Sequence, residues 1–426
     1  MLLRPNWQKS TTLTVTQFVH EWANALEVKG WNIADAGRGR PSFPSDLDAV
    51  TAMHEYTQRL ITSREVSLYG TSVLGEKKYR KMAAAGFKKE YGLDFPTYEI
   101  MFTPGGQFAI AAAAHLVQQL NGGYIITPKP WYVNHDAIIS LYSKLHPFNI
   151  WNIKEQSAKI TPQNLENAVR SCHKPGAFLF CNPGNPLGNI MRKSDWLKII
   201  PVLEKYDIPI ILDEAFAEIV FDKEFEISLL NAAPHLADRI IVMRSGTKAL
   251  GLSGERLHVM RVPSKYMPVV EEFQSRLIGN CPLSVQAGMA TAFQNMGYEK
   301  KSVISDYYKQ NADFMLKEVR HMLVGGAPEG GFYFVADFSF MLGKPMPESA
   351  KSAYTTRKNV IEDDIDICMA LMFGFGLSEK EGLGTVPASC FGIDKKRGFE
   401  RISFSSGMDN LAQVASRMNK IKAFCA

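Results

Sequence analysis

The chain has 426 residues, of which 46% are hydrophobic and 21% charged, a composition typical of a globular protein with a sizeable core. Its formal net charge of +5 is spread along the sequence without a basic tract, which argues against nucleic-acid binding. The six cysteines show no paired spacing and the N-terminus has no apolar signal segment, so we expect no disulfide framework, no metal site and no membrane span. These features favour a cytoplasmic protein.

The first part of the chain is predicted to be helical, with one turn-rich interruption. Apolar residues recur at helical spacing over residues 14–28, and a second helix is expected over 46–63. Between them, a Gly-Arg-Gly-Arg segment places Arg38 and Arg40 on either side of Gly39. Glycines and proline in this segment predict a loop rather than a third helix.

The middle of the chain, about 98–262, alternates short apolar runs with helical patterns. This alternation predicts an α/β fold with a mostly parallel sheet covered on both faces, and with ligands at the carboxyl ends of its strands. Residues 257–262 are expected to form a further strand that returns antiparallel. The expected parallel strands are 100–102, 124–127, 144–150, 177–181, 208–212 and 239–243, and the expected helices are 107–120, 132–143, 162–171, 194–206 and 226–236.

The last part of the chain predicts a second domain. Helical patterns at 283–296 and 300–322 lead into it, and the second of these is long enough to cross between two domains. The remaining elements are expected at 331–338, 362–374, 384–387, 401–403 and 408–422.

Distinctive side chains follow the first two strands of the predicted sheet. Gly105, Gly106 and Gln107 stand where a helix begins, so their backbone N–H groups could approach an anion. A glycine before a helix is also common without any ligand. Tyr132 follows the next strand and could stack on a flat ring, although core packing explains most single aromatic residues.

Polar groups also follow the strands at 177–181 and 208–212. Residues 182–188, Asn-Pro-Gly-Asn-Pro-Leu-Gly, form a rigid turn that can aim the Asn185 amide into a cleft. Asp213 ends a buried strand, where a carboxylate is costly unless it is paired, for instance with a protonated pyridine nitrogen. The alternative for Asp213 is a helix N-cap.

Lys248 lies just beyond the buried run at 240–243. A lysine in such a place could condense with an aldehyde, because lysine forms Schiff bases with carbonyl compounds and pyridoxal phosphate. Ser245 and Arg256 nearby would suit a phosphate, whereas an ordinary surface lysine would need none of these neighbours. The groups at successive strand ends together match what a phosphorylated pyridine aldehyde requires.

These motifs resemble those of the class I/II aminotransferases, pyridoxal-phosphate enzymes with the aspartate aminotransferase fold, fold type I. The resemblance extends over about residues 35–420 and includes the Asn-Pro turn, Asp-Glu-Ala-Phe at 213–216 and Ser-Gly-Thr-Lys at 245–248. It implies a large domain at 67–299 and a small domain built from 1–66 and 300–426. It also implies a homodimer with shared active sites, because Tyr69 matches a tyrosine that reaches the cofactor phosphate of the other subunit.

The resemblance implies a role for each motif residue. Lys248 would form the internal aldimine with pyridoxal 5′-phosphate and move the substrate proton, while Asp213 would keep the ring nitrogen protonated. The other cofactor contacts would come from Gly105, Gly106, Gln107, Tyr132, Asn185, Ser245, Arg256 and Tyr69. Arg401 would bind the substrate carboxylate and Gly39 would line the cleft, next to Asn185. The implied reaction transfers an amino group between an L-amino acid and a 2-oxo acid through a pyridoxamine phosphate intermediate.

Two departures leave other reactions open. Phe216 replaces a tyrosine that usually contacts the ring hydroxyl of the cofactor. The Gly-Arg-Gly-Arg loop resembles that of aspartate 4-decarboxylases, so Arg38 and Arg40 could meet a substrate carboxylate. A lyase, cyclase or decarboxylase of the same fold is therefore the alternative, and a cofactor-binding regulator without enzymatic activity is a third.

Overall fold

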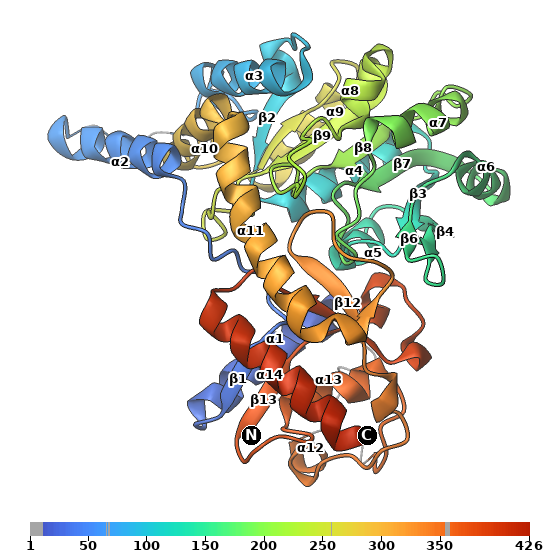
Figure 1. The fold of residues 1–426 in the computed structure, drawn as a ribbon. Coiled ribbons are helices and arrows are strands. Elements are labelled where there is room, and N and C mark those ends of the chain that lie inside the picture. The colour runs from blue at the N-terminus through green and yellow to red at the C-terminus, as the bar shows by residue number, and fades with distance from the viewer. Residues whose placement is uncertain (1–11, 65, 67–68, 257, 354–357) are drawn as a thin grey trace.

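The central element of the computed structural model is a seven-stranded sheet in the order β2-β10-β9-β8-β7-β3-β4 (Figure 1). The structure describes residues 12–426 except 65, 67–68, 257 and 354–357. All strands of this sheet are parallel except β10, which is antiparallel to both of its neighbours. The strands are β2 (Ile100–Thr103), β3 (Tyr124–Lys129), β4 (Leu145–Asn149), β7 (Pro175–Cys181), β8 (Ile210–Asp213), β9 (Ile240–Ser245) and β10 (His258–Arg261).

Both faces of the sheet are covered by helices, which explains why its central strands are largely apolar, whereas the edge strand β4 is partly exposed. On β9, Ile241 and Met243 join one core cluster while Ile240 and Val242 join the other, because successive side chains point to opposite faces. The covering helices are α3 (Lys77–Tyr91), α4 (Gly106–Leu120), α5 (Val133–Ile139), α6 (Pro162–Ser171), α7 (Lys193–Leu203), α8 (Leu229–Ala232), α9 (Met267–Leu277) and α10 (Leu283–Asn295).

A second, smaller body lies below the sheet and is reached along α11 (Tyr298–Val319), which runs between the two (Figure 1). Its antiparallel sheet has the order β11-β12-β15-β14. The elements of this sheet and its helices are β11 (Leu323–Val324), β12 (Tyr333–Asp337), β14 (Val386–Pro387), β15 (Phe399–Ser403), α12 (Glu348–Ala353), α13 (Asp364–Met372) and α14 (Met408–Cys425).

The N-terminal segment joins this smaller body. Strand β1 (Asn32–Asp35) pairs in parallel with β13 (Glu381–Gly384), and α1 (Thr12–Val28) lies beside them. Helix α2 (Leu47–Thr62) then returns to the upper body, contacts α10 and projects from the molecule (Figure 1). The two ends of the chain therefore meet in the smaller body. The domain limits at 67 and 299 remain a prediction.

The structure confirms the predicted α/β class. It also confirms the alternation of strands and helices along the chain and the antiparallel return of β10. The single helix expected over 226–236 is wrong: α8 is short and a 3-10 helix, η3 (Pro234–Arg239), follows it. Pro234 causes this break because it lacks the backbone N–H that a continuing helix would need. No helix among the described residues is long and apolar enough to cross a membrane.

Candidate active site

A cavity of about 480 Å³ opens at the carboxyl ends of the parallel strands, between the two bodies. This is where a parallel α/β sheet places its ligands. Most of the predicted site residues meet in its wall. The lining includes Gly39, Gly106, Gln107, Tyr132, Asn185, Asp213, Ser245, Lys248, Arg256 and Arg401.

Lys248 lies in this cavity with its amine buried. Its Nζ donates a hydrogen bond to the carbonyl oxygen of Gly39 at 2.9 Å, and it sits 5.8 Å from the ring centre of Phe216 and 5.5 Å from that of Phe332. Burial, together with the charges of Arg401 and Arg256, lowers the pKa of Lys248 from 10.5 to about 8, against the opposing effect of Asp213. An appreciable share of this amine is therefore neutral, and so nucleophilic, near neutral pH.

Asp213 ends β8 beneath the cavity. Its Oδ2 lies 3.0 Å from Nε2 of His135, and its Oδ1 accepts the backbone N–H of Ala215 at 3.3 Å. Burial opposes ionisation, but the hydrogen bond and charge of His135 hold the pKa of Asp213 below its usual value. A buried carboxylate that stays ionised is suited to pair with a protonated ring nitrogen.

The first turn of α4 faces Arg256 and forms an anion site. Gly105 has φ +87°, and a Cβ on it would lie 2.8 Å from Nη2 of Arg256. A Cβ on Gly106 would lie 2.6 Å from Nε2 of His258, so both positions require glycine. Ser245 Oγ already accepts the N–H of Thr247 at 3.0 Å and keeps its own proton to donate. Helix N–H groups, a hydroxyl and a guanidinium together suit a phosphate.

Asn185 and Tyr132 complete the part of the wall that would surround a ring. Asn185 is 4% exposed, and its Oδ1 has no hydrogen-bond partner among the described residues. Tyr132 is held by Asn134, whose Nδ2 donates to the phenol oxygen at 2.7 Å. A buried, unpartnered amide atom is costly unless a ligand satisfies it. The residues present therefore fit pyridoxal phosphate.

Arg401 lies on β15, across the cavity from the large sheet. It is 5% exposed, and its guanidinium carbon lies 4.2 Å from the ring centre of Tyr333. Nη2 donates to the carbonyl oxygen of Gly37, while Nε has no partner among the described residues. A buried guanidinium with unused donors can take a carboxylate as a bidentate pair.

Four predicted site residues do not line the cavity, and of these Gly105 adjoins it as the residue before α4. The guanidinium of Arg38 binds Asn24 Oδ1 at 2.5 Å and Asp35 Oδ2 at 3.4 Å, and Arg40 is exposed. Both arginines act electrostatically on His20 of the cavity wall, and their expected contact with a substrate carboxylate remains a prediction. Tyr69 is 93% exposed and lies outside the cavity.

Sequence reasoning missed several residues of the cavity wall, among them His20, Cys181, His258 and Tyr333. His258 and Cys181 had a usable signal, because each lies at the end of a buried strand beside a predicted site residue. His20 had none: it comes from α1, which reaches the cavity by packing against α5, far along the chain from it.

Comparison with known proteins agrees with this geometry. The family described as aminotransferase class I and II matches residues 35–418. The chain belongs to this family. It is a pyridoxal-phosphate-dependent aminotransferase of fold type I, as the resemblance in its motifs implied.

Individual relatives are distant but cover more than nine tenths of the chain. An aspartate/prephenate aminotransferase of Nitrosomonas europaea is 27% identical over 96% of each chain, and a putative aminotransferase, YugH, of Bacillus subtilis is 23% identical over 91% of each. Among solved structures, the aspartate aminotransferase of Thermus thermophilus with maleate superposes with a TM-score of 0.79 at 18% identity, covering 99% of this chain and 100% of that one. An aspartate aminotransferase from Rhizobium meliloti also gives 0.79, at 21% identity and coverages of 96% and 95%.

Proposed function

We propose that this aminotransferase takes the amino group of an L-amino acid and passes it to a 2-oxo acid, with Lys248 as the group that moves the proton. The observation that carries this proposal is the position of the Lys248 amine, buried between the ionised carboxylate of Asp213 and the guanidinium of Arg401. A basic amine near a carboxylate-binding arginine is what proton removal from the α-carbon of an amino acid needs.

Binding would rely on groups that the protein already holds in place. Arg401 would bind the substrate carboxylate through Nε, which has no partner among the described residues, and through Nη2, which would release the carbonyl oxygen of Gly37. This pair would orient the α-carbon of the substrate toward Lys248. Pyridoxal phosphate, when bound, supplies the electron-withdrawing ring that makes the α-proton acidic. Asp213 would keep the ring nitrogen protonated, and Asn185 would bind the ring hydroxyl.

Once the α-proton has been removed, amino transfer would require a proton to be returned on the same face. Lys248 is placed for this because, within the described part of the chain, its amine donates only to the carbonyl oxygen of Gly39 and forms no ion pair. The surrounding rings of Phe216 and Phe332 keep water from this side of the cavity. The lysine can therefore return the same proton to a neighbouring carbon.

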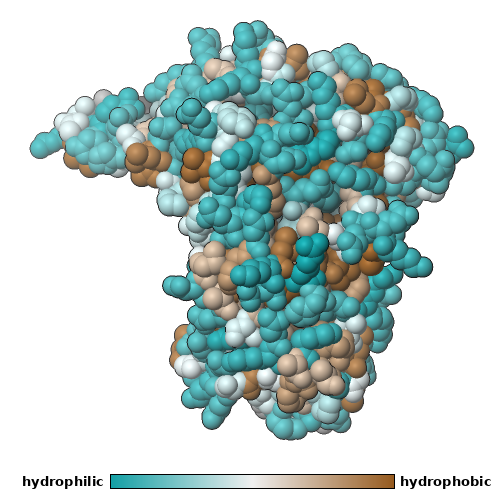
Figure 2. Space-filling view, in the orientation of Figure 1, coloured by the Kyte–Doolittle hydropathy of each residue, from teal (hydrophilic) through white to brown (hydrophobic). Residues whose placement is uncertain are grey.

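The second subunit is also part of the proposal. Tyr69 is exposed, and α2, which projects from the body, carries the exposed apolar residues Leu47, Val50 and Ile61; apolar patches are visible along it in Figure 2. Exposed apolar surface of this kind is typical of an interface. These features support a homodimer in which Tyr69 contributes to the neighbouring site.

The alternative of a lyase, cyclase or decarboxylase rested on Phe216 and on the loop with Arg38 and Arg40; Phe216 lines the cavity, whereas neither arginine does. Amino transfer is therefore the function that the site supports best. The test mixes the cofactor-loaded protein with single amino acids and no oxo acid. Stoichiometric loss of the visible cofactor band, reversed by a 2-oxo acid, is the expected result. Continuous turnover without an oxo acid would contradict it, and Lys248→Ala serves as the inactive control.

A further inference from the structure

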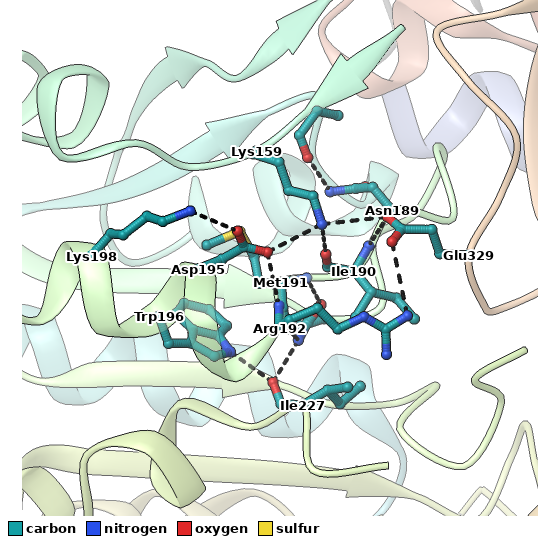
Figure 3. Close-up of polar contacts among 12 residues, drawn as sticks. Lys159, Asn189, Ile190, Met191, Arg192, Asp195, Trp196, Lys198, Ile227 and Glu329 are labelled. Atoms are coloured by element: carbon teal, nitrogen blue, oxygen red, sulfur yellow. Dashed lines mark hydrogen bonds and ion pairs between the residues drawn. The ribbon is translucent and has the colours of Figure 1, made fainter. Parts of the chain in front are cut away.

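One carboxylate joins the turn that carries Asn185 to the smaller body. Glu329 lies on the segment that leads into β12, and its Oε2 accepts the backbone N–H of Ile190 at 3.0 Å (Figure 3). Lys159 donates to the carbonyl oxygen of the same Ile190 and lies 3.5 Å from Glu329 Oε2. Arg192 lies 3.8 Å from Oε1 of Glu329. The carboxylate of Glu329 thus contacts the backbone at Ile190, just after the turn, and the two neighbouring cations Lys159 and Arg192.

The backbone of the two segments is equally close. The N–H groups of Glu329 and Gly330 both donate to the carbonyl oxygen of Gly188, at 2.8 and 3.0 Å. Gly188 has φ +67°, and a Cβ on it would lie 2.6 Å from Cβ of Pro328. Leu187 packs in one apolar cluster with Val335 of β12. The side of the turn that faces away from the cavity therefore packs against the segment that leads into β12.

The near side of the same turn faces the cavity. Asn185 projects its unpartnered amide there, three residues from Gly188, while Phe332 follows Glu329 on the other segment and faces Lys248. Asn185 has no side-chain partner of its own that would fix the amide oxygen among the described residues. Its position consequently depends on the turn, which is held by its own hydrogen bonds from Gly184 to Asn189 and from Gly188 to Gly184 and, just beyond it, by Glu329.

We propose that Glu329, together with Lys159, is a positioning residue that holds the Asn185 amide at the hydroxyl edge of the cofactor ring. The proposal rests on the proposed role of Asn185 and adds the group that enforces it. Because Glu329 also precedes Phe332, this contact sets the spacing between the turn and the aromatic ring beside Lys248. A salt bridge alone would contribute little at a half-exposed position. The effect arises because the carboxylate also binds the backbone of the turn.

The structure provides a matched control. Lys198 lies 3.7 Å from Asp195, which also pairs with Lys159, yet Lys198 has no contact in Figure 3 with Ile190 or Glu329. Lys198→Met therefore removes a charge from the same cluster and leaves the turn in place. Glu329→Gln keeps the shape and the backbone acceptor but removes the charge, and Glu329→Ala removes both.

The experiment titrates the visible absorption band of the cofactor-loaded full-length protein and measures the dissociation constant of pyridoxal phosphate. The Nδ2 group of Asn185, rather than its Oδ1, would donate to the ring oxygen and favour the ionised form of that oxygen, so its displacement raises the pH midpoint of the band. We expect Glu329→Ala to raise the midpoint by about half a pH unit or more and to weaken cofactor binding about tenfold, the cost of one hydrogen bond. The pH midpoint and the dissociation constant of Lys198→Met should match those of the wild type. Those of Glu329→Gln and Lys159→Met should lie between the values for Lys198→Met and for Glu329→Ala.

The same substitutions in an Asn185→Ala background distinguish an effect on the position of the Asn185 amide from a general loosening of the site. If Glu329 acts through Asn185, Glu329→Gln should leave the midpoint of this background unchanged. An equal shift in both backgrounds, or a shift no larger than that of Lys198→Met, would overturn the proposal. If the wild type itself showed no cofactor band, the proposed function would fail instead, so the two failures are distinguishable.

Discussion

The lowered pKa of Lys248 should control how fast the cofactor-free protein captures pyridoxal phosphate. Only the neutral amine attacks an aldehyde. With a pKa of about 8 in place of 10.5, the neutral fraction at pH 7 rises from about 0.03% to about 9%, roughly a 300-fold gain. The capture rate should therefore increase with pH and level off above pH 8.

The neighbouring charges predict opposite shifts for two variants. Arg401→Gln removes a positive charge that lowers the pKa of Lys248, so its rate profile should move to higher pH. Asp213→Asn removes a charge that raises this pKa, so its profile should move to lower pH. Stopped-flow absorbance across pH 6–10 measures both, with free lysine under the same buffers correcting for titration of the cofactor. A wild-type rate that still rises tenfold per pH unit at pH 9.5 would refute the reasoning.

Three further predictions concern single side chains. Arg401→Lys keeps the charge but loses bidentate geometry, so the KM for amino acids should rise roughly 30-fold with little change in melting temperature; an unchanged KM would place the carboxylate elsewhere. Glu214 is buried, which raises its pKa above 4.5, so the folded state retains a proton that the unfolded state loses and stability falls as pH rises. Glu214→Gln should therefore gain melting temperature over the wild type between pH 5 and 8, and a constant difference would argue against a raised pKa. Gly188→Ala forces a Cβ into Pro328 at φ +67° and should lower the free energy of unfolding by about 2–4 kcal/mol in urea titrations; a loss below about 1 kcal/mol would mean that the segment yields.

The large sheet could be predicted from the sequence because its signal is local. Buried parallel strands are apolar on both faces, and each is followed by a polar residue that the cavity uses, as at Asp213 and Lys248. The order of the strand ends along the chain was enough to assemble most of the cofactor site. Asn185, Tyr132 and Arg256 lie where that order placed them.

The substrate side of the site could not be predicted in the same way. It depends on β1, whose partner β13 lies more than three hundred residues further along the chain. Asp35 ends β1 and pairs with Arg38 only three residues further on, while Asn410 of α14 accepts the backbone N–H of Asp35 at 3.0 Å. The spacing of Asp35 and Arg38 can be read from the sequence, but the pairing with a distant strand that places this segment beside the cavity cannot.

The antiparallel return of β10 has a consequence for protein engineering. Lys248 and Arg256 both lie on the connection between β9 and β10, and His258 pairs directly with Ser245 across the two strands. Both ends of this connection are thus fixed by the pairing of β9 with β10. Inserting residues on one side of Lys248 would therefore displace Arg256 as well. A transplant of this site into another scaffold would have to carry residues 245–258 as one unit, together with the first turn of α4 that faces it.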